Sequence, residues 1–119
     1  MDVTYYGYPK CTTCKKAEKW LKENDISYAA ANIAEEPPSA GELRQMVETS
    51  GLPLKKFFNT SGQKYRELGL KDKLPAMSED EQLALLASEG MLIKRPLVTD
   101  GEKTTVGFAE QTFEDTWKS

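Results

Sequence analysis

A pair of cysteines between a short strand and a helix is the feature that most constrains the fold. Residues 3–6, Val-Thr-Tyr-Tyr, are β-branched and aromatic and predict a strand, which a glycine and a proline then end. Residues 12–23 have apolar side chains at helical spacing. Cys11 and Cys14 therefore mark the start of a helix that directly follows a strand, and this placement is typical of redox-active cysteine pairs in α/β proteins.

The rest of the sequence predicts further strands separated by a helical stretch. Residues 26–31 predict a second strand, and two capping boxes, Ser-x-x-Glu, begin helices within residues 37–90. Near the end, residues 97–99 and 104–106 predict two strands joined by an Asp-Gly turn, followed by a helix over 109–117.

The element order is therefore β-α-β, then helices, then β-β-α. This is the order of an α/β, thioredoxin-like (glutaredoxin-like) fold with an inserted helical subdomain. We expect a single domain over residues 1–119, with residues 1–36 and 91–119 as the thioredoxin-like core and residues 37–90 as the helical insert.

Composition excludes several classes of function. The 119 residues, 39% of them hydrophobic, suit one domain with a hydrophobic core. The sequence contains no run of about 18 apolar residues, so no membrane span is predicted. The N-terminus lacks the pattern of a signal peptide, so we expect a cytoplasmic protein, and a monomer. The net charge of −3 without a basic block argues against a direct nucleic-acid ligand, and the absence of His excludes His-based catalysis and His metal ligands.

Several interpretations of the two cysteines remain open from spacing alone. A zinc site needs four ligands, so it would require a second copy of the chain. A structural disulfide is uncommon in the cytoplasm, but two buried cysteines that merely pack as small apolar residues would look the same.

The surroundings of the pair favour a working dithiol. Cys11 falls at a helix N-terminus, where free N–H groups and the helix dipole stabilise an anion, and Lys10, Lys15 and Lys16 add positive charge. Cys14 is one turn further into the helix, on its apolar face. We therefore expect Cys11 to be the attacking thiolate and Cys14 the resolving thiol.

A second motif, Arg95-Pro96, comes directly before the predicted third strand. In a thioredoxin-type fold, a cis proline at this point lies against the active-site thiols. Arg95 would then pair with the thiolate or with an anionic substrate. An ordinary proline at the start of a strand and an exposed surface arginine are the simpler alternatives. The candidate catalytic residues are thus Cys11, Cys14 and Arg95, and the candidate substrate-binding residues are Lys10, Thr12, Thr13 and Pro96.

Three motifs, spread over the chain, together point to a known family. They are Tyr8-Pro9-Lys10-Cys11-Thr12-Thr13-Cys14-Lys15-Lys16-Ala17, Arg95-Pro96-Leu97-Val98 and Val106-Gly107-Phe108. The chain resembles the arsenate reductase (ArsC)/Spx family over essentially its whole length. The resemblance implies a glutaredoxin-like fold with an inserted helical domain, and it implies either arsenate reduction with glutathione and glutaredoxin or redox-sensing regulation through RNA polymerase.

The sequence departs from each of these two groups at identifiable places. The glutaredoxin-linked arsenate reductases hold their oxyanion with three arginines, and only Arg95 matches here, with Asn59 and Phe108 at the other two positions. Spx regulators usually continue into a basic tail, whereas this sequence stops at Ser119.

The sequence therefore predicts a thiol–disulfide oxidoreductase that acts on a thiol, a disulfide or a small oxyanion. No bound cofactor is expected, but an external thiol reductant such as glutathione or thioredoxin is. The alternatives are an arsenate reductase and an Spx-type regulator whose helical insert docks on RNA polymerase. Thioredoxin, glutaredoxin and RNA polymerase are the candidate protein partners.

Overall fold

The computed structural model describes residues 3–118. In chain order, the strands, α-helices and 3₁₀ helices are β1 (Val3–Gly7), α1 (Thr12–Glu23), β2 (Tyr28–Asn32), α2 (Ala40–Ser50), η1 (Leu54–Phe57), α3 (Gln63–Glu67), α4 (Leu70–Lys73), η2 (Leu74–Ala76), α5 (Glu79–Ser88), η3 (Gly90–Leu92), β3 (Leu97–Thr99), β4 (Thr104–Val106) and α6 (Glu110–Trp117).

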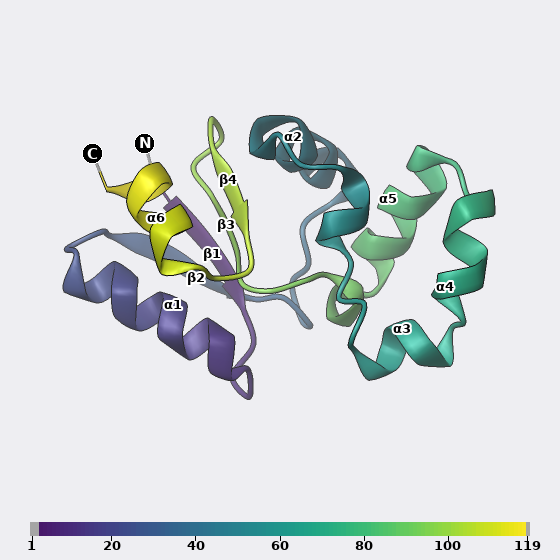
Figure 1. Cartoon of the computed structure of the whole chain (residues 1–119), viewed down its shortest axis with the longest axis horizontal. Helices are drawn as coiled ribbons and strands as arrows, with labels where there is room; N and C mark the ends of the chain where they lie inside the picture. The colour runs from purple at the N-terminus through teal and green to yellow at the C-terminus, as the bar shows by residue number, and fades with distance from the viewer. Residues whose placement is uncertain (1–2, 119) are drawn as a thin grey trace.

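The strands form one four-stranded sheet in the order β2-β1-β3-β4. β1 pairs parallel with β2 and antiparallel with β3, and β3 pairs antiparallel with β4. A parallel pair requires a crossover connection, which α1 supplies between β1 and β2. This α/β arrangement, with helices placed between β2 and β3, is the thioredoxin-like fold expected from the order of elements (Figure 1).

The two faces of the sheet are covered by different parts of the chain because strand side chains alternate in direction. Val3, Tyr5 and Val98 pack in one cluster with apolar residues of α1 and α6. Tyr6 and Leu97, their neighbours, pack in a second cluster with residues of the helical region. Figure 1 shows α1 and α6 on one side of the sheet and α2 to α5 extending away on the other.

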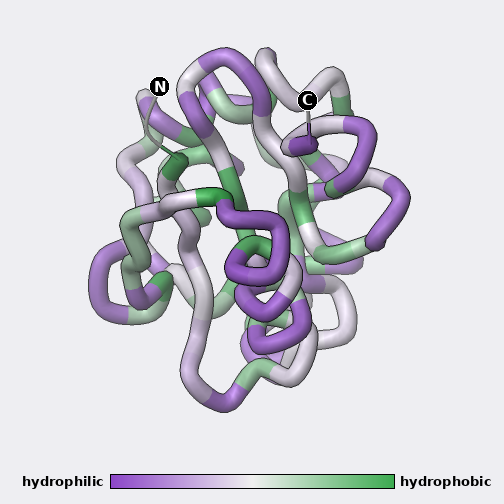
Figure 2. The backbone as a smooth tube through the Cα atoms, turned by 90° about the vertical axis from the view of Figure 1, so that its left-hand side faces the viewer, coloured by the Kyte–Doolittle hydropathy of each residue, from purple (hydrophilic) through white to green (hydrophobic). Residues whose placement is uncertain are grey.

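The helical region is stabilised by local capping and by contacts between its helices. Both predicted capping boxes are present, at Ser39 and Ser78, where each serine accepts a hydrogen bond from the backbone N–H three residues later. α2 and α5 are also linked by Arg44, which pairs with Glu79 and Asp80. Figure 2 shows hydrophilic stretches mainly on the outward turns and loops. None of the helices in residues 3–118 could span a membrane.

The second strand begins later than predicted, at Tyr28 rather than residue 26. The N–H of Ile26 donates to the Leu21 carbonyl, and Asp25 takes a positive φ of 56°. Residues 25 and 26 therefore close the C-terminus of α1 instead of pairing with β1. The sequence analysis also did not predict α4 and η2 as individual helices.

Candidate functional site

Cys11 is the N-cap residue of α1. Its backbone is extended (φ −93°, ψ 112°), its N–H donates to the Tyr8 carbonyl at 3.1 Å, and its Sγ accepts a hydrogen bond from the N–H of Cys14 at 3.2 Å. A sulfur here takes the place that a Ser or Asp oxygen usually has at an N-cap. The Cys11 sulfur therefore lies at the N-terminus of α1, where it takes part in capping the helix.

Cys14 lies one turn further along α1, in the core. Its side chain is 1% exposed and packs against Ala17, Leu21 and Trp20 of the same helix. Burial raises the pKa of the Cys14 thiol to about 12. Both cysteines are free thiols. The pair therefore combines a half-buried sulfur at the helix N-terminus with a protonated, buried sulfur within the same first turn.

A buried tyrosine supports this turn from the strand beneath it. The Tyr5 hydroxyl donates to the Cys14 carbonyl at 3.1 Å, and burial raises the pKa of Tyr5 so that the hydroxyl keeps its proton. Gly7 makes this contact possible, because a Cβ atom at that position would overlap the Tyr5 ring and hydroxyl. The β1 sequence thus positions the cysteine pair as well as preceding it.

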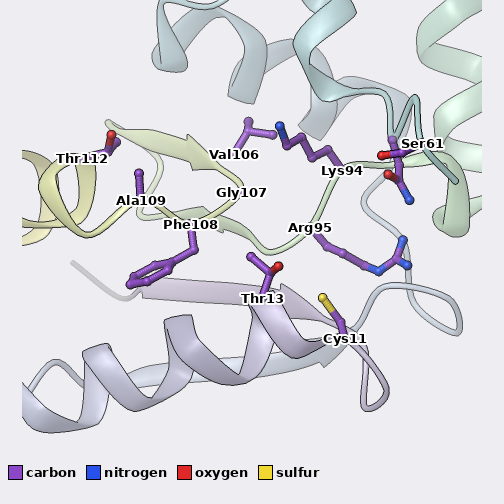
Figure 3. Close-up of a pocket in the computed structure, with 11 residues that line it drawn as sticks. Cys11, Thr13, Ser61, Lys94, Arg95, Val106, Gly107, Phe108, Ala109 and Thr112 are labelled. Atoms are coloured by element: carbon purple, nitrogen blue, oxygen red, sulfur yellow. The ribbon is translucent and has the colours of Figure 1, made fainter.

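Cys11 opens into a cavity of about 470 Å³ between α1, the helical region and the β4–α6 connection (Figure 3). It is lined by Cys11, Thr13, Asn59, Ser61, Lys94, Arg95, Val106, Gly107, Phe108, Ala109 and Thr112. We call Cys11 and Thr13 the thiol wall, and the remaining nine residues the distal wall.

The predicted site residues divide into two groups by position. Cys11, Thr13 and Arg95 line the cavity, and Cys14 lies behind Cys11 in the core. The other three, Lys10, Thr12 and Pro96, are not among the lining residues. Lys10 and Thr12 are exposed near Cys11, and Pro96 is buried.

Arg95 lies at the cavity, and few groups near it neutralise the positive charge of its guanidinium. The Arg95–Pro96 peptide bond is cis, as the sequence suggested. The guanidinium lies 5.5 Å from the centre of the Tyr8 ring, and its one hydrogen bond within residues 3–118 is a long one, 3.5 Å, to the Met91 carbonyl. The buried Nε of Arg95 has no hydrogen-bond partner there. Within the described residues, the charge of Arg95 is therefore not neutralised by an ion pair.

The distal wall is assembled by backbone hydrogen bonds between distant segments. Phe58 and Ile93 form an isolated antiparallel bridge. The N–H of Asn59 donates to the Leu92 carbonyl at 2.7 Å, and that of Lys94 donates to the Phe57 carbonyl at 2.8 Å. Asn59 and Lys94 are thereby fixed on one wall.

The β4–α6 connection completes the distal wall. Gly107 has φ 78°, and its N–H donates to the Pro96 carbonyl at 2.8 Å, which brings Phe108 to the cavity. Asn59 and Phe108, which the sequence comparison with the family predicts to stand at the two other arginine positions, both line the cavity with Arg95. Lys94 was missed by the sequence analysis, although its position next to Arg95 was the available signal.

Metal binding has no support in the described part of the chain. No group of three or more Cys, Asp or Glu side chains is placed to hold a metal ion within residues 3–118. The cavity itself offers one thiol, two cations and neutral polar groups.

The strand order and the thiol at the start of α1 define this molecule as a thioredoxin-fold protein with an added helical region. Residues 6–116 match the family model described as the ArsC family, and the chain belongs to that family.

Three similar proteins place the chain within the family. It is 66% identical to the uncharacterized protein YusI of Bacillus subtilis, over 98% of this chain and 99% of that protein. It is 32% identical to the global transcriptional regulator Spx of Listeria innocua, over 91% of this chain and 81% of that protein. The crystal structure of a possible arsenate reductase from Streptococcus mutans is similar with a TM-score of 0.86 and 50% identity, covering 94% of this chain and 97% of that one.

Proposed function

We propose that this protein is a thiol–disulfide oxidoreductase that uses Cys11 and Cys14 in the cytoplasm. The observation that carries the proposal is the placement of the two sulfurs. Cys11 is half-buried in a cavity and accepts the N–H of Cys14 at 3.2 Å, while Cys14 is buried one turn behind it. An accessible sulfur at a helix N-terminus, with a protected second thiol nearby, is the arrangement that two-step disulfide exchange uses.

In the first step, the Cys11 thiolate attacks one sulfur of a substrate disulfide. A bond forms between the two sulfurs, the substrate S–S bond breaks, and the other half leaves as a thiolate that takes a proton from water. In the second step, Cys14 loses its proton and attacks the Cys11 sulfur, which releases the rest of the substrate as a thiolate. The substrate disulfide is thus reduced by two electrons and the cysteine pair is oxidised to a disulfide, which an external thiol such as glutathione or thioredoxin resets.

The raised pKa of Cys14 makes the rate of the second step depend on pH. Because that pKa is about 12, the Cys14 thiol keeps its proton at neutral pH, and only a small fraction is available to attack. The second step should therefore accelerate as the pH rises above neutral.

A redox titration tests this proposal. The protein is equilibrated in graded thiol/disulfide buffers, alkylated, and its blocked thiols are counted by mass. We expect a reversible Cys11–Cys14 disulfide with a midpoint of roughly −180 to −320 mV, the range of cytosolic couples and known oxidoreductases. Cys11→Ser should abolish disulfide reduction, whereas Cys14→Ser should stop at a mixed disulfide. If no intramolecular disulfide formed at any potential, the two-thiol mechanism would be wrong.

Arsenate reduction is a second candidate, favoured by Arg95, a cation without an ion-pair partner in residues 3–118 that lines the same cavity as Cys11. The similar protein from Streptococcus mutans is named as a possible arsenate reductase. Arsenate turnover supported by glutathione or thioredoxin, and impaired by Arg95→Ala, would establish this activity. A rate no higher than that of buffer without protein would exclude it.

Redox-controlled regulation is a third candidate, favoured by the similarity to Spx. In this case the cysteine disulfide would change the affinity of the helical region for RNA polymerase. Capture of RNA polymerase by the reduced and the oxidised protein is the direct comparison. Equal capture in both states, or none in either, would remove a redox-controlled docking role.

A further inference from the structure

The cavity beside Cys11 contains two cationic residues and no carboxylate. Its lining includes Lys94 and Arg95, together with neutral polar residues and a single aromatic ring, but no Asp or Glu. Neither cation forms an ion pair with any residue in 3–118, where the ion pairs involve Arg44, Lys64 and Lys103. The lining of this cavity therefore carries two positive charges and no negative one. Arg95 also lines a neighbouring hollow that contains Glu67 and Glu89, whereas Lys94 does not.

The two cations reach different parts of the cavity. Figure 3 shows the Arg95 side chain extending from the backbone in one direction and the Lys94 side chain in another, toward Val106. Lys94 passes over Gly107, where a Cβ atom, if the residue had one, would lie 3.2 Å from the Lys94 Cε and 3.9 Å from its Nζ. Because Lys94 lies apart from the Arg95 guanidinium, it provides a second positive region at the β4–α6 connection.

The start of α6 adds to this second region. Ala109 is the N-cap of this eight-residue helix and provides no side-chain cap, and both Ala109 and Thr112 line the cavity. The first-turn N–H groups of a helix lack intrahelical partners and favour a negative charge nearby. Glu110, the acidic residue of this first turn, is not among the lining residues.

We propose that Lys94 selects a small disulfide whose substituent carries a negative charge, such as a carboxylate a few bonds from the sulfur. The inference rests on the proposed disulfide chemistry and names its substrate class. The reacting sulfur would lie at Cys11, and the anionic end of the substituent would lie at Lys94 and the start of α6. A volume of about 470 Å³ is within the range of small-molecule sites, so it can accept a whole substituent and not just a reacting sulfur.

The test uses the Cys14→Ser protein, because it stops at the mixed disulfide and isolates the first step. Three short disulfides of similar length supply the comparison: anionic 3,3′-dithiodipropionate, neutral bis(2-hydroxyethyl) disulfide and cationic cystamine. The rate of mixed-disulfide formation is measured by mass, and each rate is divided by that of free mercaptoethanol with the same disulfide. This ratio removes the intrinsic reactivity of each compound.

We expect the normalised rates to decrease from the anionic to the neutral to the cationic disulfide. Lys94→Gln should reduce the ratio of the anionic to the neutral rate about fivefold, the effect of one partly exposed ion pair, and Lys94→Glu should reverse the preference. The preference should also weaken at high salt, since the charges are in contact with solvent.

Lys22→Gln is the matched control, because it removes the same charge from an exposed position on α1 that does not line the cavity. Equal effects of Lys22→Gln and Lys94→Gln would mean that only net charge matters and would overturn the inference. Equal normalised rates for all three disulfides would also overturn it, while leaving the proposed function intact. If none of the disulfides modified Cys11, the proposed function itself would fail.

Discussion

The two walls of the cavity are built in different ways. The thiol wall comes from one short stretch, where a strand ends and a helix begins, and hydrogen bonds between residues three apart fix it. The distal wall comes from three segments, residues 59–61, 94–95 and 106–112, which long-range backbone hydrogen bonds bring together.

This difference separates the chemistry of the site from its selectivity. Cys11 is positioned by β1 and α1 alone, whereas the positions of Lys94 and Arg95 depend on how the helical region rejoins the sheet. Substitutions that disturb the contacts between the helical region and the sheet should therefore change the substrate selectivity more than the reactivity of Cys11.

Gly90→Ala should have the largest effect on stability. Gly90 is buried at the end of the helical region, and a Cβ atom there would overlap the Ile33 carbonyl oxygen, which belongs to rigid backbone. We expect a loss of roughly 3 kcal/mol in the free energy of unfolding, the upper end of the usual cost of overpacking, measured by urea unfolding. Gly41→Ala, within α2 and with no heavy atom closer than 4.0 Å, should instead be neutral or stabilising.

The Gly90 variant also tests the separation of the two walls. At a temperature where it is folded, it should retain Cys11 reactivity toward the neutral disulfide but lose part of the preference for the anionic one. A stability equal to that of the unmodified protein would show that the chain near Ile33 is not as rigid as described.

Tyr5→Phe should cost about 1.5 kcal/mol, because it removes the buried hydrogen bond that the Tyr5 hydroxyl donates to the Cys14 carbonyl. Tyr6→Phe is the matched control on the opposite face of the sheet, where the hydroxyl makes no hydrogen bond within the described chain. Urea unfolding of both variants gives the difference. Equal stability of the two variants would mean that the Tyr5 hydroxyl on β1 does not stabilise the thiol wall.

The thiol wall was predictable because its determinants are local. The spacing of Cys11 and Cys14, the bounds of α1 and the two capping boxes can each be read within a few residues, and all are present in the fold. The strands 97–99 and 104–106 were also predicted correctly, since a turn signal separates two short β-branched runs. The roles assigned to the site residues stay predictions.

The distal wall was much less accessible from sequence. Lys94 becomes a cavity residue only because its N–H pairs with Phe57, a contact that no local pattern encodes. Similarly, α4 and η2 are too short to show a helical period, and their buried residues Leu70 and Leu74 are recognisable only once the core around them is known.

The stability of the reduced protein should depend on pH through Cys14. Its folded pKa, about 12, is above the value of about 8.5 for a free cysteine, so above pH 8.5 the unfolded chain releases this proton while the folded protein keeps it. Stability is therefore fully present below about pH 8.5 and should fall by about 1.4 kcal/mol per pH unit above it. Urea unfolding under a reductant at pH 8, 9 and 10 measures this slope, which Cys14→Ser should make markedly shallower; an unchanged slope would contradict the assignment.

The smallest expected effect on stability comes from Gly107→Ala, which tests the distal wall alone. Gly107 has φ 78°, so Gly107→Ala should cost about 1 kcal/mol from backbone strain, and its new Cβ would press on the Lys94 side chain. Gly51→Ala, with φ 71° and nothing within 4 Å, should lose similar stability without touching Lys94. The two variants should therefore be about equally stable, but only Gly107→Ala should change the ratio of the anionic to the neutral disulfide rate. If both changed it equally, selectivity would follow overall stability, and the distinction between the two walls would not hold.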